Sequence, residues 1–185
     1  MGGIVDPKTG DVIWTLHVPV ADQIAHYRAH PPRSLEGLRA TPIDVDWKFD
    51  GHGEPVNAVF ELACACGGTK FCAMCDADAD HMVCSPISLH CDACEAVYEI
   101  FDSGTDGYDG EAGDLPGDDG EGPYDLETHE VDEPFEAVVR YEYPSDHLGD
   151  PDYAGREHNL YSWFTLLARD PETKKLEHLY DFECA

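Results

Sequence analysis

Basic side chains are scarce in this sequence. It has 11 Lys and Arg against 39 Asp and Glu, a formal net charge of −28 at pH 7, and no Lys or Arg between Lys70 and Arg140. Because nucleic-acid-binding surfaces neutralise phosphates with Lys and Arg, such a chain repels DNA and RNA. The same charge disfavours anionic membrane surfaces. The composition therefore predicts no nucleic-acid partner and no membrane attachment, and it favours a protein partner with a basic surface. Adaptation to high salt would produce the same acidity.

Long apolar runs and familiar catalytic motifs are also absent. No stretch is long and apolar enough for a transmembrane helix, and residues 1–6 lack the basic start and apolar core of a secretory signal. We therefore expect a cytoplasmic protein whose cysteines stay reduced. The motifs GxSxG and HExxH and a phosphate-binding loop do not occur. No residue is assigned a catalytic role, and an enzyme is not the favoured interpretation.

Cysteines are plentiful in one stretch, which contains seven of the eight. Cys64 and Cys66 follow one strand-like run, and Cys91 and Cys94 follow another, so each pair lies in a short turn. Two such pairs brought together form a tetrahedral four-sulfur site, for which Zn²⁺ is favoured over iron. Disulfides are the main alternative, but the reducing compartment expected above favours the metal.

The order strand, knuckle, insertion, knuckle, strand resembles the zinc ribbons over about a fifth of the chain. The resemblance implies a fold with a structural zinc site and no particular activity. Two features depart from the usual ribbon. The first pair has one intervening residue instead of two, and 24 residues separate Cys66 from Cys91.

The insertion between the two pairs contains four more candidate ligands. Cys72 and Cys75 form one pair, and His81 and Cys84 form the other. Such a set could bind a second Zn²⁺. The alternative is that the cysteines are small buried side chains.

Alternation of apolar and polar residues predicts a mainly β fold, an antiparallel sheet with an embedded zinc-ribbon-like subdomain and one short helix. The helix is expected at residues 21–30, where two prolines end it. Beyond an N-terminal hairpin, strands are expected at residues 43–50, 56–63, 96–101, 135–143, 159–169 and 176–184. We divide the chain into hairpin, helix and strand (1–55), the zinc-ribbon-like subdomain (56–101), an acidic Gly-rich loop or linker (102–133) and strands that complete the sheet (134–185), together one compact domain.

Three functions agree with this pattern. The favoured one is a zinc-binding acidic protein with a structural metal site that acts through protein–protein interaction. The second is a decoy that imitates a polyanion and occupies the nucleic-acid-binding surface of a basic protein. The third is a metalloenzyme of unknown reaction, which would need a zinc ion with three protein ligands and an open position.

Overall fold

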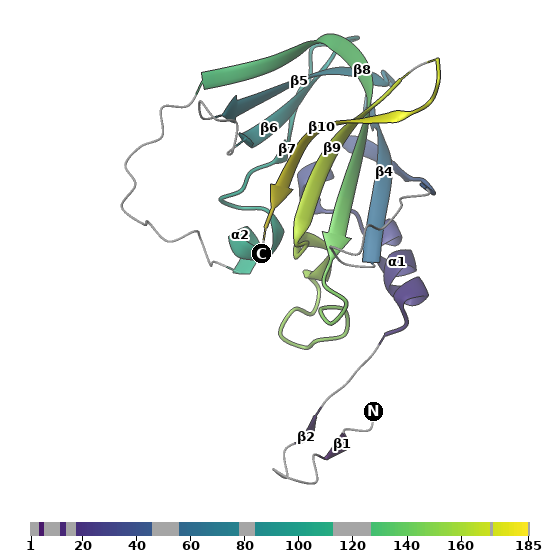
Figure 1. The fold of residues 1–185 in the computed structure, drawn as a ribbon, viewed down its shortest axis with the longest axis vertical. Coiled ribbons are helices and arrows are strands. Elements are labelled where there is room, and N and C mark those ends of the chain that lie inside the picture. The colour runs from purple at the N-terminus through teal and green to yellow at the C-terminus, as the bar shows by residue number, and fades with distance from the viewer. Residues whose placement is uncertain are drawn as a thin grey trace.

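The computed structural model of the protein describes residues 4–5, 12–13, 18–45, 56–77, 84–112, 127–170 and 172–184. Eight of the strands form one curled antiparallel sheet (Figure 1), so the predicted mainly β fold is confirmed. These eight strands are β3 (Leu38–Pro42), β4 (Val56–Cys64), β5 (Lys70–Ala77), β6 (Cys84–Cys91), β7 (Val97–Phe101), β8 (Glu127–Tyr143), β9 (Trp163–Arg169) and β10 (Leu176–Glu183).

The other elements are short. They are β1 (Ile4–Val5), β2 (Val12–Ile13), α1 (Val20–Ala29), α2 (Gly107–Ala112) and the 3₁₀ turns η1 (Arg33–Leu35) and η2 (Glu157–Asn159). β1 and β2 pair with each other in antiparallel register, as expected of the N-terminal hairpin. Within the described ranges, no helix has the length and apolar character needed to cross a membrane.

Strand β8 is the scaffold of the sheet. Its Val138 pairs with β4 on one side and with β9 on the other. Glu136 pairs with Lys70 of β5 and with Arg169 of β9, so β5 lies on the same flank of β8 as β4. β4 and β5 therefore follow one another along a single flank of β8, separated by the turn that holds the first cysteine pair.

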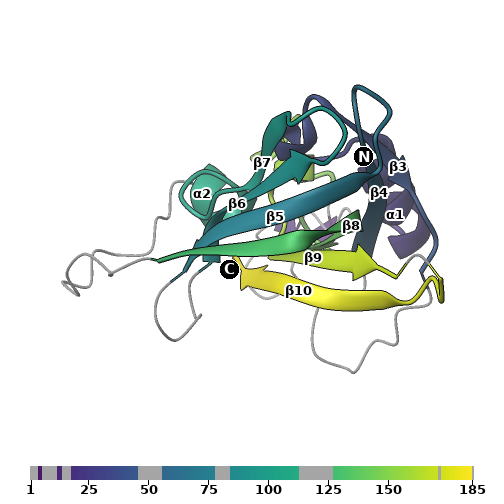
Figure 2. The same cartoon turned by 90° about the horizontal axis from the view of Figure 1, so that it is seen from above.

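The sheet divides into two branches at this turn. We refer to the point at which β4 and β5 separate as "the fork". β3 extends the sheet from β4, whereas β6 and then β7 extend it from β5. The turn η1 contacts both β3 and β7, so the two branches approach each other again there (Figure 2). The curl of the sheet thus brings the start of β7 close to the end of β4.

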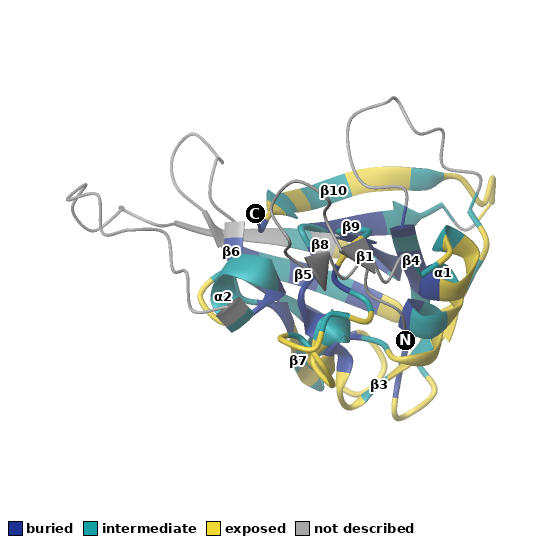
Figure 3. Ribbon diagram, turned by 90° about the horizontal axis from the view of Figure 1, so that it is seen from below, coloured by how far each residue is buried: buried dark blue, intermediate teal, exposed yellow. Residues whose placement is uncertain are grey.

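Helix α1 packs against β4, with its buried side toward the sheet and its exposed side toward solvent (Figure 3). The ring of Tyr27 stacks on Tyr143 of β8 with centroids 3.7 Å apart. A second stack joins Phe101 of β7 to Phe164 of β9 at 4.8 Å. Burial of a large aromatic side chain stabilises a fold by about 2–3 kcal/mol for each ring.

The prediction of a strand at residues 43–50 is wrong for residues 43–45, and the rest of it is not tested. The partner of β4 is β3, which ends at Pro42, whereas residues 43–45 are not in a strand and 46–50 lie outside the described residues. Ile43 still donates its N–H to the carbonyl of Val59 at 3.0 Å, and Ile43 and Val45 pack on a small apolar cluster. At Ile43 and Val45 the alternation therefore reflects packing against the sheet and not a position within it.

The segment predicted as an acidic loop contains two regular pieces, α2 and the beginning of β8. Tertiary contacts hold α2 despite its two glycines: the N–H of Tyr108 donates to the carbonyl of Tyr161 at 2.9 Å, and that of Asp109 to the carbonyl of Cys184 at 3.1 Å. The register of β5 on β8 shifts around Pro134, where a bulge accommodates the missing N–H. Strand β9 begins at Trp163, four residues later than predicted, because η2 occupies the start of that segment.

Candidate metal centre

Two turns of similar construction present the four predicted ligands. The first knuckle (residues 64–69) follows β4, and the second (residues 91–96) follows β6. In the first, the carbonyl of Cys64 accepts the N–H of Gly67 at 2.9 Å, and the N–H of Cys64 donates to Gly68 at 2.8 Å. In the second, Cys91 makes the same two bonds with Glu95 (2.8 Å) and Ala96 (2.9 Å), one residue further along the chain.

This difference of one residue explains the unusual spacing of the first pair. In the knuckle with one residue between its cysteines, the first cysteine is hydrogen-bonded to the third and fourth residues after it. In the knuckle with two intervening residues, the first cysteine is hydrogen-bonded to the fourth and fifth residues after it. Each turn needs one left-handed residue, which is Gly67 (φ 92°) in the first and Glu95 (φ 62°) in the second. The shorter spacing is thus compatible with the same kind of site.

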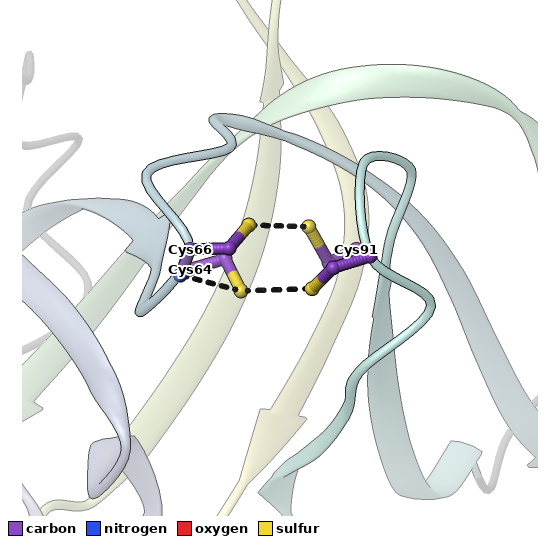
Figure 4. Close-up of side chains that lie close together, drawn as sticks. Cys64, Cys66 and Cys91 are labelled. Carbon is purple, nitrogen blue, oxygen red and sulfur yellow. Dashed lines mark hydrogen bonds between the residues drawn. The ribbon is translucent and has the colours of Figure 1, made fainter.

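The four sulfur atoms of Cys64, Cys66, Cys91 and Cys94 come together, all within 4.8 Å of one another. The Sγ atoms of Cys64 and Cys94 are 3.5 Å apart, and those of Cys66 and Cys91 are 3.7 Å apart. Figure 4 shows the two turns facing each other across the sulfurs. Each short distance joins one knuckle to the other, so the cluster spans both turns.

The donor set fits a tetrahedral metal ion. Four Zn–S bonds of about 2.3 Å place the sulfurs about 3.8 Å apart, close to the two distances found. A disulfide would need about 2.05 Å, and the four thiols are free. Four thiolates are the ligands typical of structural zinc and of iron in sulfur sites, and they leave no open position on a tetrahedral ion.

The four thiols differ in their exposure to solvent. Cys64 and Cys91 are buried, with 2% of each exposed, whereas Cys66 and Cys94 are exposed. The cluster therefore has a half that faces the core and a half that faces water.

Tyr98 of β7 places its hydroxyl oxygen 3.0 Å from the Sγ atom of Cys64. This hydrogen bond is the main cause that lowers the pKa of Cys64 to about 6, with a contribution from the N–H of Cys66. Contact with Cys64 and burial raise the pKa of Tyr98, so the phenol keeps its proton and acts as the donor. The N–H of Ala96 lowers the pKa of Cys94, but the thiols of Cys66, Cys64 and Cys91 outweigh it and raise that pKa to about 12. The hydrogen bond from Tyr98 thus favours the thiolate form of Cys64.

Sequence reasoning missed two residues of this centre. Tyr98 carries no sequence signal beyond its place in a strand, because its approach to Cys64 depends on the curl of the sheet. Gly68 allows the knuckles to come close, since a Cβ atom there would lie 3.0 Å from the Cys91 sulfur. The two glycines directly after Cys66 are the sequence signal that indicates room for this close approach.

The structure separates two of the four residues predicted for a second site. Cys75 lies on the buried face of β5 with 2% exposed, and Cys72, three residues earlier, lies on the other face. Cys72 is the cross-strand partner of His90 instead. His81 and the side chain of Cys84 lie outside the described residues, so the second site stays a prediction. Among the described residues, the four knuckle cysteines form the one group arranged to hold a metal ion.

No family model matches the chain, and no curated protein and no solved structure matches it. The cysteine cluster is therefore the feature from which a function can be inferred.

Proposed function

We propose that Cys64, Cys66, Cys91 and Cys94 bind one Zn²⁺ ion whose role is structural. The observation that supports the proposal is the set of four sulfurs within 4.8 Å, contributed equally by two turns that are separate in the sequence. Thiolates bind the ion once they have lost their protons, and the binding free energy then adds to the stability of the fold.

The position of the cluster suggests what the ion stabilises. It lies where the two branches of the sheet part, and it links the end of β4 to the turn between β6 and β7. The N–H of Asp92 also donates to the carbonyl of Lys70 at 3.1 Å, which ties the second knuckle to β5. A bound ion would join the two branches at the fork, where β4 and β5 share β8 as a partner and do not pair with each other.

The test is the metal content of three proteins purified without added metal: wild type, Cys91→Ser and Cys75→Ser. Cys75 is a matched control because it has the same exposure, 2%, and lies on the strand next to β6. Elemental mass spectrometry should find one zinc per chain in wild type and Cys75→Ser and none in Cys91→Ser. A folded wild type without metal would contradict the proposal. Two zincs in wild type and one in Cys75→Ser would identify the second site.

We also propose that the protein acts by binding a partner with a basic surface. The support is the net charge of −28 together with the use of basic side chains in ion pairs within the chain. Among the described residues, five Lys or Arg side chains are in ion pairs with carboxylates of this chain; they are Arg28, Arg33, Arg140, Arg169 and Lys174. Attraction between opposite charges is screened by salt. A partner purified with this chain should therefore dissociate between 0.1 and 0.5 M NaCl, and an affinity independent of salt would contradict a charge-driven complex.

Four thiolates give no support to the metalloenzyme alternative, because a catalytic zinc keeps a position for water or substrate. The decoy alternative rests on the same excess of acidic residues, but it predicts a different effect on the partner. It requires that the partner lose its nucleic acid when this chain binds. A competition experiment with labelled DNA on the identified partner separates the two.

A further inference from the structure

The hydroxyl of Tyr98 reaches a metal-ligand sulfur from the opposite branch of the sheet. Tyr98 belongs to β7, which extends the sheet from β6, whereas Cys64 ends β4 on the other side of the fork. The O···S distance of 3.0 Å is within the range of a good hydrogen bond to sulfur. A single side chain therefore connects the two branches through one of the proposed ligands.

The ring of Tyr98 is held in place by a turn. A Cβ atom at Gly37 would lie 3.4 Å from the Cε1 atom of Tyr98, so the ring packs directly on the backbone between η1 and β3. Gly37 has φ +87°, a conformation that side-chain-bearing residues rarely adopt. Tyr98 also packs against the main apolar core. The ring is supported from two sides, and its hydroxyl is directed at Cys64.

The contact lies on the buried half of the cluster. Cys64 is 2% exposed, whereas Cys66 and Cys94 face solvent. Water can hydrate the sulfurs on the exposed half, but Cys64 depends on protein donors, which are the Tyr98 hydroxyl and the more distant N–H of Cys66 at 3.5 Å. Groups that hydrogen-bond a metal ligand fix its orientation and tune the electron density that it offers to the metal.

We propose that Tyr98 is a positioning residue of the metal centre. Its O–H group orients the Cys64 sulfur toward the other three cysteine sulfurs. Its ring keeps β7 packed against the branch formed by β3 and β4. The proposal rests on metal binding by the four cysteines. It adds that a residue outside the knuckles organises the site. Tyr98 strengthens metal binding by orienting the ligand Cys64 and is not itself a ligand.

The experiment compares wild type with Tyr98→Phe as full-length chains. This substitution leaves the ring on Gly37 and removes only the hydroxyl. Zinc affinity is measured by competition with a chelating dye, and the cobalt-substituted proteins are examined by absorption spectroscopy. Tyr153→Phe is the matched control, because Tyr153 is also partly buried and its hydroxyl is hydrogen-bonded to Tyr108, away from the cluster.

We expect Tyr98→Phe to bind zinc about tenfold or more weakly, the usual effect of losing a group that orients a ligand. The thiolate-to-cobalt charge-transfer band should move to longer wavelength, because a sulfur without its hydrogen bond gives up an electron more readily. A residue that served only packing would not move this band. Tyr153→Phe should match wild type in both measurements.

The outcomes separate this proposal from the proposed function. If wild type binds cobalt and zinc through the cysteines, while Tyr98→Phe equals it in affinity and band position, then Tyr98 has no positioning role and the metal site stands. If wild type binds neither metal, both proposals fail together. Circular dichroism of each variant confirms that the comparison is between folded chains.

Discussion

The backbone of Gly68 lies against the sulfur of Cys91, and a Cβ atom there would be only 3.0 Å from it. It would also be 3.3 Å from the sulfur of Cys66. A methyl group at this position therefore pushes two proposed ligands from different knuckles away from each other. Close approach of the knuckles requires glycine here.

We predict that Gly68→Ala weakens zinc binding about tenfold, since displaced ligands lose their favourable geometry. Competition with a chelating dye measures the effect. Gly104→Ala is the control, because its Cβ would meet the Asp102 carboxylate at an ordinary 3.4 Å. Equal affinity in the two variants would show that the sulfurs tolerate the added methyl group.

Two buried tyrosines should respond to loss of their hydroxyls in opposite ways. Tyr143 donates to the carbonyl of His158 at 3.1 Å, whereas the hydroxyl of Tyr161 has no hydrogen-bond partner among the described residues. Tyr143→Phe should lower the free energy of unfolding by about 1 kcal/mol, and Tyr161→Phe should leave it unchanged or raise it. Urea denaturation measures both. A cost for Tyr161→Phe as large as that for Tyr143→Phe would show that its hydroxyl is bonded in solution.

Gln23 links the start of α1 to a distant turn. It is fully buried, and its Nε2 donates to the carbonyls of Val18 (2.7 Å) and Ser145 (3.0 Å). Gln23→Ala removes both bonds and leaves two carbonyls unpaired, so we expect a loss of about 2 kcal/mol in the free energy of unfolding. The exposed neighbour Asp22 provides the comparison, and Asp22→Asn should cost less than about 1 kcal/mol. Similar losses in the two variants would contradict the role of Gln23.

Stability should decrease as the pH falls below about 6.5, the usual pKa of histidine. Burial lowers the pKa of His26, helped by the charge of His30, and burial also lowers the pKa of His158. The unfolded chain therefore binds more protons than the folded chain between these lowered values and 6.5, so acid favours unfolding in that window.

Urea midpoints at several pH values from 7.5 to 5.5 measure this dependence. The double variant His26→Gln, His158→Gln should show a smaller decrease than wild type at the same metal content. An identical pH dependence in the two proteins would assign the acid sensitivity to other groups.

The sequence was sufficient to group the four knuckle cysteines, because short spacings between strand-like runs leave few alternatives for their sulfurs. It was also sufficient for the mainly β class and for most strands, where alternation is unbroken. It did not predict β3, the strand that pairs with β4. Residues 43–45 alternate like a strand but pack on Val59 and Val138 from outside the sheet, and a single sequence does not distinguish the two arrangements.

The features that the sequence did not predict depend on contacts between distant segments. Nothing near Tyr98 indicates that the sheet curls and divides so that its hydroxyl meets Cys64. The helix α2 forms in a Gly- and Asp-rich segment because Tyr161 and Cys184 accept its first N–H groups. Local propensity gave the opposite expectation there.

The shared flank of β8 has a consequence for the order of folding. β4 and β5 are complete by residue 77, but the strand on which both align begins only at Glu127. During synthesis, the hairpin of β5 and β6, β7 and both knuckles emerge before β8, and they need only local pairing. We expect a newly made chain to capture its metal first and to add β8 alongside β4 and β5 afterwards. In refolding, loss of free thiols would then precede the burial of Tyr141 and Tyr143.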